Sequence, residues 1–298
     1  MKKLFAALLL GLLLLGAFTP LNADPAQQER QSLDQAKNLF NQGDIQQAET
    51  LLKEIMKQFS GEGAYFQLGD FYENTGKLSD AKAVYQEMVK LFPTQDGALS
   101  RLIEIDFKTA DFAQIPKLCE QLISLMPDRQ AKAYYFLGLL NQTQGNFTQA
   151  KEFYQKALKA DPSSLEAFGK LTQLYALTGE EAKADTLFKT MSDLMPGNRE
   201  LVQQMADYYA RNGETGKAID LLKELTAKYP GLLEQRQRLA ELYAQTGKIE
   251  PAVEEYTSLL KLAPGQKEAL SQYLQMLLNT NQMEKVKAVL EQVSGKWK

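Results

Sequence analysis

Glycine and proline recur along the chain at intervals that a single globular domain does not produce. Glycines stand at positions 43, 76, 145, 179, 213 and 247, and prolines at positions 93, 127, 162, 196, 230 and 264. Neighbours in each series lie 33 to 35 residues apart, or twice that distance. A fixed period of this length indicates a repeat architecture. The chain is therefore predicted to be an array of similar units.

Two further positions keep a fixed distance from each glycine. Five residues after it comes a small residue, and nine residues after it comes a large apolar one: Ala48, Ala81, Ala150, Ala184, Ala218 and Ala252, then Leu52, Tyr85, Tyr154, Phe188, Leu222 and Tyr256. Glycine at a turn tolerates the left-handed conformation that ends a helix, and proline stops the next helix. Each unit is predicted to be a pair of antiparallel helices, A and B, that must stack on its neighbours to bury its apolar face.

Two stretches carry a more specific pattern. Tyr65, Leu68, Gly69, Tyr72, Gly76, Ala81 and Tyr85 form one, and Tyr134, Leu137, Gly138, Gly145, Ala150 and Tyr154 form the other. Both resemble the tetratricopeptide repeat, with tyrosine at the first position where tryptophan is usual. The resemblance implies an all-α fold, a right-handed α-solenoid of about eight stacked helix-turn-helix units. We place these units near 29-61, 62-95, 96-130, 131-164, 165-198, 199-232, 233-266 and 267-298.

The N-terminus differs from the repeats. Lys2 and Lys3 precede an uncharged apolar run over residues 4–18, and Ala23 stands before Asp24. This pattern is typical of a secretory signal peptide, here residues 1-23, followed by a short linker over residues 24-28. As a helix the run would span about 22 Å, less than the ~30 Å hydrocarbon core, but an uncleaved inner-membrane anchor remains an alternative. Both interpretations predict a body outside the cytoplasm, periplasmic or secreted.

The composition argues against most enzymatic chemistry. The chain has no histidine and one cysteine, Cys119, so histidine-based triads, histidine-ligated zinc and cysteine pairs are excluded. Its 34 basic residues stand against 37 acidic ones, which lacks the basic excess of a nucleic-acid binder. We predict a protein that is not an enzyme, with no catalytic residue, cofactor or metal, and no nucleic-acid partner. Any membrane contact would come from the N-terminal segment alone.

The resemblance implies a binding surface along the concave groove, which helix A lines. The predicted groove residues of the N-terminal half are aromatic or of mixed charge: Phe66, Asp70, Glu73, Glu104, Phe107 and Tyr135. Those of the C-terminal half are acidic or amide residues: Glu166, Gln173, Glu200, Gln203, Asp207, Glu234, Gln237, Glu241 and Glu268. In the first unit the same register holds Lys37 and Phe40. A clamp for a C-terminal carboxylate, which in the family uses lysine and asparagine at such positions, is rejected because these positions hold glutamine, serine, aspartate and glutamate here.

These features predict a protein-binding scaffold of the periplasm or cell envelope that holds partner segments in its groove. The acids of the C-terminal half favour a partner segment rich in lysine or arginine. An alternative of another class is a component of exopolysaccharide or outer-membrane export that contacts glycan directly, with Phe66, Phe107 and Tyr135 as its platform.

Two units depart from the pattern. The third has Ala110 in place of the turn glycine, Asp106 in place of an apolar or aromatic residue, Pro116 early in helix B, where it would remove a hydrogen bond, and one extra residue near positions 128–130. We predict that residues 96–130 form either a joint between two sub-stacks or only a decayed repeat. The last unit is apolar on two faces with no capping helix after it, and we predict that this C-terminal unit either self-associates or frays.

Overall fold

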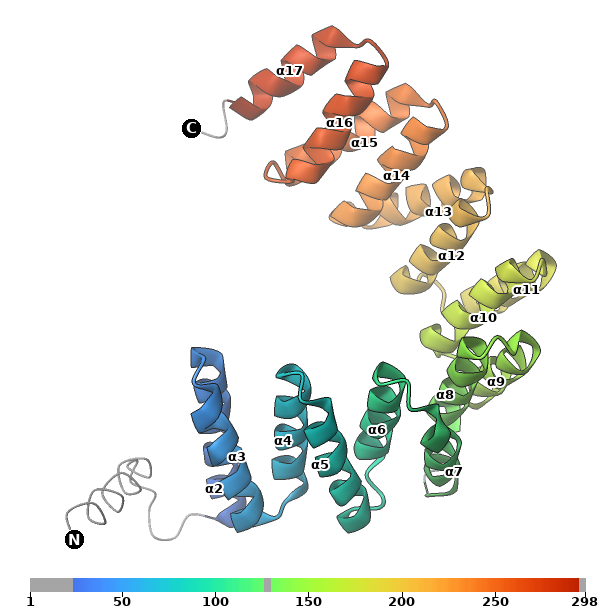
Figure 1. Ribbon diagram of the computed structural model, residues 1–298. Coiled ribbons are helices and arrows are strands. Elements are labelled where there is room, and N and C mark those ends of the chain that lie inside the picture. The colour runs from blue at the N-terminus through green and yellow to red at the C-terminus, as the bar shows by residue number, and fades with distance from the viewer. Residues whose placement is uncertain (1–23, 126–129, 295–298) are drawn as a thin grey trace. The chain divides into compact units, whose positions relative to one another are not determined.

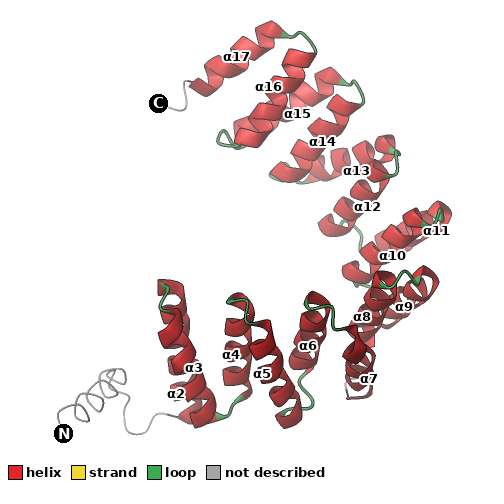
Figure 2. Ribbon diagram, viewed as in Figure 1, coloured by secondary structure: helices red, strands yellow, loops and turns green. Residues whose placement is uncertain are grey.

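The computed structural model describes residues 24–125 and 130–294. All regular secondary structure in these ranges is helical (Figure 2). The chain divides into two compact parts between Leu140 and Asn141, within one helix. The predicted signal peptide lies outside the described residues, and among the described helices none is long and apolar enough to cross a membrane.

The N-terminal part consists of paired helices in chain order (Figure 1). Its elements are α2(Pro25–Gln42), α3(Ile45–Phe59), α4(Glu62–Asn74), α5(Leu78–Leu91), α6(Asp96–Lys108), the short 3-10 helix η1(Phe112–Gln114), α7(Ile115–Leu125) and most of α8(Gln130–Thr143). The segment predicted as a linker differs from that expectation. Asp24 caps α2 by accepting a hydrogen bond from the Ala26 amide, and Pro25 is the first helical residue, so the linker forms the first turn of α2.

The C-terminal part continues the same alternation. Its elements are α9(Phe147–Ala160), α10(Leu165–Leu177), α11(Glu181–Leu194), α12(Arg199–Arg211), α13(Thr215–Lys228), α14(Leu233–Gln245), α15(Ile249–Leu262), α16(Lys267–Asn279) and α17(Met283–Ser294). Even-numbered helices from α2 to α16 are helix A of a repeat, and the odd-numbered helices are helix B. The prediction of an all-α fold built from helix-turn-helix units is confirmed.

The turn glycines explain how each pair of helices reverses direction. Gly43 and Gly76 have φ values of 88° and 74°, the left-handed region that costs a residue with a side chain on the order of 1 kcal/mol. A Cβ added at either glycine would meet nothing within 4 Å, so the backbone conformation alone requires glycine there. Ala110 and Asn281 occupy the same turn position in the third and eighth repeats with φ values of 55° and 57°.

Small residues let the two helices of a repeat approach closely. A Cβ built on Gly69 of α4 would lie 2.5 Å from the ring of Tyr85 on α5, so only glycine fits against that ring. Ala206 and Ala218 are likewise buried, on α12 and α13. Cys119 is fully buried, and burial raises the pKa of its thiol to about 12, which makes it an inert apolar residue.

The third repeat differs from the prediction at one point. Pro116 is the second residue of α7, where a helix needs no hydrogen bond from it, because η1 delays the start of helix B. The predicted loss of a hydrogen bond inside a helix therefore does not occur. Asp106 is fully buried, and its Oδ1 lies 2.5 Å from the Lys82 Nζ of the preceding repeat. The extra residue expected near positions 128–130 lies partly outside the described residues, and the joint stays a prediction.

Candidate functional site

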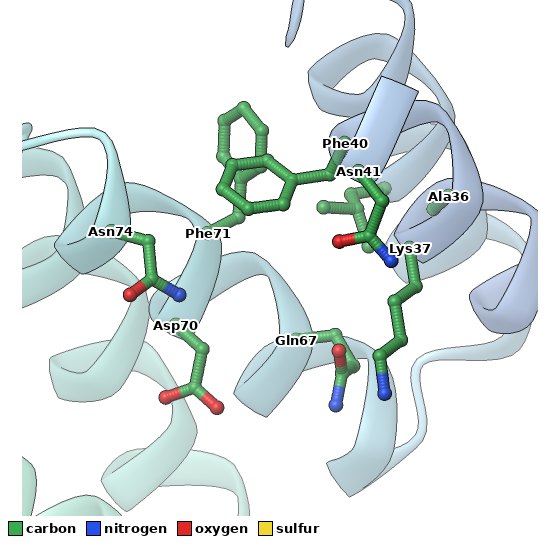
Figure 3. Close-up of a pocket in the computed structure, with 9 residues that line it drawn as sticks. Ala36, Lys37, Phe40, Asn41, Gln67, Asp70, Phe71 and Asn74 are labelled. Atoms are coloured by element: carbon green, nitrogen blue, oxygen red, sulfur yellow. The ribbon is translucent and has the colours of Figure 1, made fainter. Parts of the chain in front are cut away.

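A cleft of about 300 Å³ lies between helix A of the first repeat and helix A of the second. Helix α2 contributes Lys37, Phe40 and Asn41; α4 contributes Gln67, Asp70, Phe71 and Asn74; Ala36 and Leu52 complete the lining. Figure 3 shows side chains of the two helices facing each other across the cleft. The rings of Phe40 and Phe71 pack edge to face with their centroids 5.7 Å apart, so the cleft combines an apolar wall with polar groups.

Helical spacing explains why these residues share one face. Lys37 and Asn41 are four residues apart on α2, and Gln67, Asp70 and Asn74 follow at intervals of three and four on α4. Asn41 and Asn74 each stand two residues before a turn glycine, so they are equivalent positions of successive repeats. Each amide supplies both donors and an acceptor, which is the complement of a peptide backbone.

The charge of Asp70 is balanced by the adjacent repeat. Its carboxylate accepts a hydrogen bond from the Tyr85 hydroxyl at 2.8 Å and lies 3.4 Å from the Arg101 guanidinium. Burial, followed by the hydrogen bond to Asp70, raises the pKa of Tyr85 far above its ordinary value, so the phenol stays protonated as a donor. The Tyr85 hydroxyl and the Arg101 guanidinium therefore fix the Asp70 carboxylate, a hydrogen-bond acceptor, at the edge of the cleft.

A network of charges continues from Asp70 along α4 and α6. Glu73 contacts the Lys108 ammonium at 2.8 Å and the Arg101 guanidinium at 3.8 Å. Glu104 contacts the same guanidinium at 3.3 Å. The structure thus brings together the three acids predicted for this half of the groove, but around a central arginine that the sequence analysis did not single out.

The three predicted aromatic groove residues are committed to packing. Phe66 lies edge to face with Tyr85 at 6.1 Å and covers Gly97, whose added Cβ would lie 2.4 Å from that ring. Phe107 packs on Phe112 and Phe136, and Tyr135 packs on Phe136. All three rings are half-buried, so the arrangement does not favour an open platform for a sugar.

The acids of the C-terminal half fall into two groups. Glu166, Glu200, Glu234 and Glu268 are exposed, and each is the second residue of a helix A. A carboxylate in the first turn stabilises the positive end of the helix dipole, which gives these four a structural role as well. Asp207 is half-buried, and Glu241 lies 3.1 Å from Arg238. Arg238 therefore offsets part of this acidity.

The amide residues predicted for this half lie on the same helices. Gln173 is exposed on α10, and Gln203 is half-buried on α12. Gln237 of α14 donates to Gln272 of α16 at 3.0 Å and to Glu241 at 3.3 Å. Among the residues that the structure describes, no group of three potential ligands is arranged to hold a metal ion.

The three amides that line the cleft were not among the predicted groove residues. The predicted groove residues lie 13, 10, 6 or 3 residues before each turn residue, and this register does not include Asn41, Gln67, Phe71 and Asn74. Two asparagines at the same distance from successive turn glycines were the available signal.

Comparison with known proteins agrees with this architecture. Models of the tetratricopeptide repeat match residues 33–96, 131–164, 199–242 and 236–266. In the solved structures, a tetratricopeptide repeat protein from Parabacteroides merdae superposes with a TM-score of 0.53 at 17% identity, over 85% of this chain and 99% of that one.

The curated relatives match over short stretches. The probable biofilm formation methyltransferase WspC of Pseudomonas putida is 41% identical over 69 residues, 23% of this chain and 16% of that protein. The photosystem I assembly protein Ycf3 of Prochlorococcus marinus is 28% identical over 80 residues, 24% of this chain and 46% of that protein. The chain thus spans less than half the length of these relatives. From the repeat matches and the helical pairs together, the chain belongs to the tetratricopeptide repeat family.

Proposed function

We propose that this chain is a non-enzymatic scaffold that binds segments of partner proteins on the helix A faces of its repeats. The α2–α4 cleft carries this proposal, because it is lined by three amides, one lysine and one aspartate beside two aromatic rings. Amides that donate and accept hydrogen bonds suit an extended peptide backbone, and the rings suit an apolar side chain of the same segment. The relative from Prochlorococcus marinus is named an assembly protein, which agrees with a scaffold role.

The likeness to the methyltransferase does not extend this role to catalysis. It covers 16% of that protein, and the matched stretch is a repeat region of this chain. The histidine-free composition and the single buried cysteine argue for binding rather than chemistry.

The C-terminal part favours a basic segment of the partner. Glu166, Glu200, Glu234 and Glu268 repeat on four successive A helices and remain exposed. Like charges spaced along one set of helices add their fields, and such attraction weakens as salt shortens the Debye length from ~10 Å at 0.1 M to ~3 Å at 1 M. The proposed partner therefore combines lysine or arginine residues with an extended stretch for the cleft.

We also propose that the body lies in the periplasm or cell envelope. The support is the sequence pattern of residues 1–23, two lysines followed by an apolar run and a small residue before Asp24. N-terminal sequencing of fractionated protein should find a chain that begins near Asp24 outside the inner membrane. A cytosolic chain that retains Met1 would contradict this location.

Site-specific photo-crosslinking in cells tests the binding surface. A photoreactive amino acid at Gln67, inside the cleft, should capture a defined set of proteins, whereas the same group at Gln86, an exposed residue of α5 outside the cleft lining, should not. The Asn41→Ala/Asn74→Ala variant should lose this capture without changing the helical circular dichroism. Equal capture from Gln67 and Gln86, or capture unchanged by the double variant, would contradict the proposal.

A further inference from the structure

Each repeat uses one large side chain to reach the next repeat. It stands nine residues after the turn residue. The ring centroid of Phe188 lies 4.8 Å from that of Tyr208 and 5.2 Å from that of Tyr209, both on α12. The ring of Tyr256 stacks on that of Tyr273 of α16, with the centroids 5.2 Å apart. In the first seven repeats this side chain is at most 4% exposed: Leu52, Tyr85, Cys119, Tyr154, Phe188, Leu222 and Tyr256. In the eighth repeat it is Leu290, which is 49% exposed. Among the described residues no helix A follows α17 to cover it.

The first repeat shows the other half of the same interface. The residue four positions before the turn contacts helix B of the preceding repeat in two buried cases: the Tyr72 hydroxyl donates to Glu49 of α3, and the ring centroid of Tyr209 lies 5.2 Å from that of Phe188 of α11. Its counterpart Leu39 is only half-buried and lines a cavity of about 210 Å³ between α2 and α3, together with Leu51 and Thr50. Because Leu39 has the register of Tyr72 and Tyr209, we infer that this cavity adjoins the surface that a preceding helix B covers in those repeats.

Charges follow the same register. At three repeat interfaces, an ion pair joins the sixth residue after one turn to the first residue after the next turn. These pairs are Glu49–Lys77 at 2.6 Å, Lys82–Asp111 at 2.8 Å, and Lys151–Glu180. At the two ends of the array the corresponding residues are Lys287 and Asp44, both exposed and opposite in charge.

We propose that copies of this chain associate head to tail, with α17 of one copy packed on α2 and α3 of the next. In this arrangement Leu290 packs over Leu39 of the next copy, and Lys287 pairs with Asp44 of the next copy as well as with its present neighbour Glu284. The contact repeats the interface that already joins consecutive repeats within the chain. Because its two surfaces differ, each added copy leaves the same surface free, so the assembly grows instead of closing as a pair.

This contact is separate from the proposed binding of partner segments. The cavity between α2 and α3 shares no lining residue with the α2–α4 cleft. Stacking would therefore line up successive copies while each cleft stays available. Failure of one proposal leaves the other standing.

Sedimentation velocity of the purified full chain, from micromolar to millimolar concentration, tests the association. The wild-type average mass should rise with concentration past that of a dimer. Leu290→Asp, which disables the α17 surface, and Thr50→Arg, which places a long cation over the cavity, should each remain monomeric. An equimolar mixture of these two variants should form dimers and nothing larger, because each copy retains one working end. Leu262→Asp, at an exposed leucine at the end of α15, is the matched control and should associate as the wild type does.

Charge reversal gives a second test with little risk to folding. Asp44→Lys and Lys287→Glu should each weaken association, and the double variant should recover it because the opposite charges are restored between copies. A wild type that is monomeric throughout the range would overturn the proposal. So would association abolished by Leu290→Asp but unaffected by Thr50→Arg, since that result indicates a symmetric contact between two C-terminal ends.

Discussion

Removing the ammonium of Lys82 should destabilise the fold, because it leaves a buried carboxylate unpaired. Asp106 is fully buried, and its Oδ1 lies 2.5 Å from the Lys82 Nζ. Its Oδ2 is also buried and has no hydrogen-bond partner among the described residues. Lys82→Met keeps the aliphatic chain and deletes the charge, so the variant leaves a buried carboxylate without its counter-ion.

The size of the effect follows from the burial of the pair. Breaking a buried ion pair by removing one partner costs about 3–5 kcal/mol. Because the Lys82 side chain is 22% exposed, water reaches this end of the pair, and we expect about 3 kcal/mol, the lower end of that range. Adding Asp106→Leu should return the free energy of unfolding to within about 1 kcal/mol of wild type, since an apolar residue of similar volume replaces the charge. Leu277 already occupies this position in the eighth repeat and is buried.

The loss should also depend on pH. Burial raises the pKa of Asp106 above its ordinary 3.8, and the hydrogen bond from Lys82 opposes the rise, so Lys82→Met raises that pKa further. A raised pKa means that the folded state binds the proton more readily than the unfolded state. The deficit of the variant is therefore complete above the pKa of Asp106 in the variant, shrinks as the pH falls through it, and becomes constant below the pKa of Asp106 in the wild type.

Urea unfolding followed by circular dichroism, combined with hydrogen exchange of the amides of α5 and α6, measures both quantities. The single and double variants should be compared with wild type at neutral pH and near the ordinary pKa of aspartate. A loss below ~1 kcal/mol for Lys82→Met, the size typical of a surface pair, would refute the reasoning. A double variant no more stable than the single one would refute it as well.

Three further predictions concern other parts of the chain. Ala110→Gly should stabilise the third repeat by on the order of 0.5 kcal/mol, and Gly76→Ala should destabilise the second by about 1 kcal/mol, since both positions have positive φ. If urea titration shows that the free energy of unfolding changes in the same direction for both variants, this reasoning is wrong. Hydrogen bonds from two lysines and a tyrosine lower the pKa of Glu49 from 4.5 to about 2, so the stability that Glu49 contributes is present above pH 4.5 and lost as the pH falls toward 2. In thermal melts at neutral pH, Glu49→Gln should be less stable than wild type by ~1 kcal/mol or less. This difference in stability should disappear in acid. Changing both Asp207 and Glu241 to lysine should reduce partner capture in pull-downs without changing the circular dichroism. Capture that is unchanged by this double substitution or by added salt would contradict the proposal of a partner segment rich in lysine or arginine.

The fold was predictable because its determinants are local and periodic. Gly43 and Gly76 mark turns that require positive φ, and Tyr85 opposite Gly69 marks the close contact of two helices. The turn glycines and the close helix contact occur once in each repeat, so both features recur at a fixed distance in the sequence. The third repeat was harder, since η1 moves the start of helix B and places Pro116 in a first turn, a shift that its spacing alone does not reveal.

The candidate site was less predictable because a helix face is wider than a fixed register. Phe66 and Phe107 lie on helix A as expected, but their rings fill gaps between helices that only the packed structure defines. Asn41 and Asn74 line the cleft, and each directly follows a residue of the predicted groove register, Phe40 and Glu73. The position of Arg101 at the centre of a charge network was not predictable from its spacing, because two of the three acids that it contacts lie on another helix.

The central claim is that partner segments bind the helix A faces, and hydrogen exchange on a purified complex tests it most directly. A partner identified by crosslinking from Gln67 would be added to the full chain, and amide protection compared with and without it. We predict increased protection in α2 and α4, which supply most of the cleft lining, with α5 little changed, and loss of this protection in the Asn41→Ala/Asn74→Ala variant. Protection that increases only in helix B segments, or that is the same in the variant, would contradict the account.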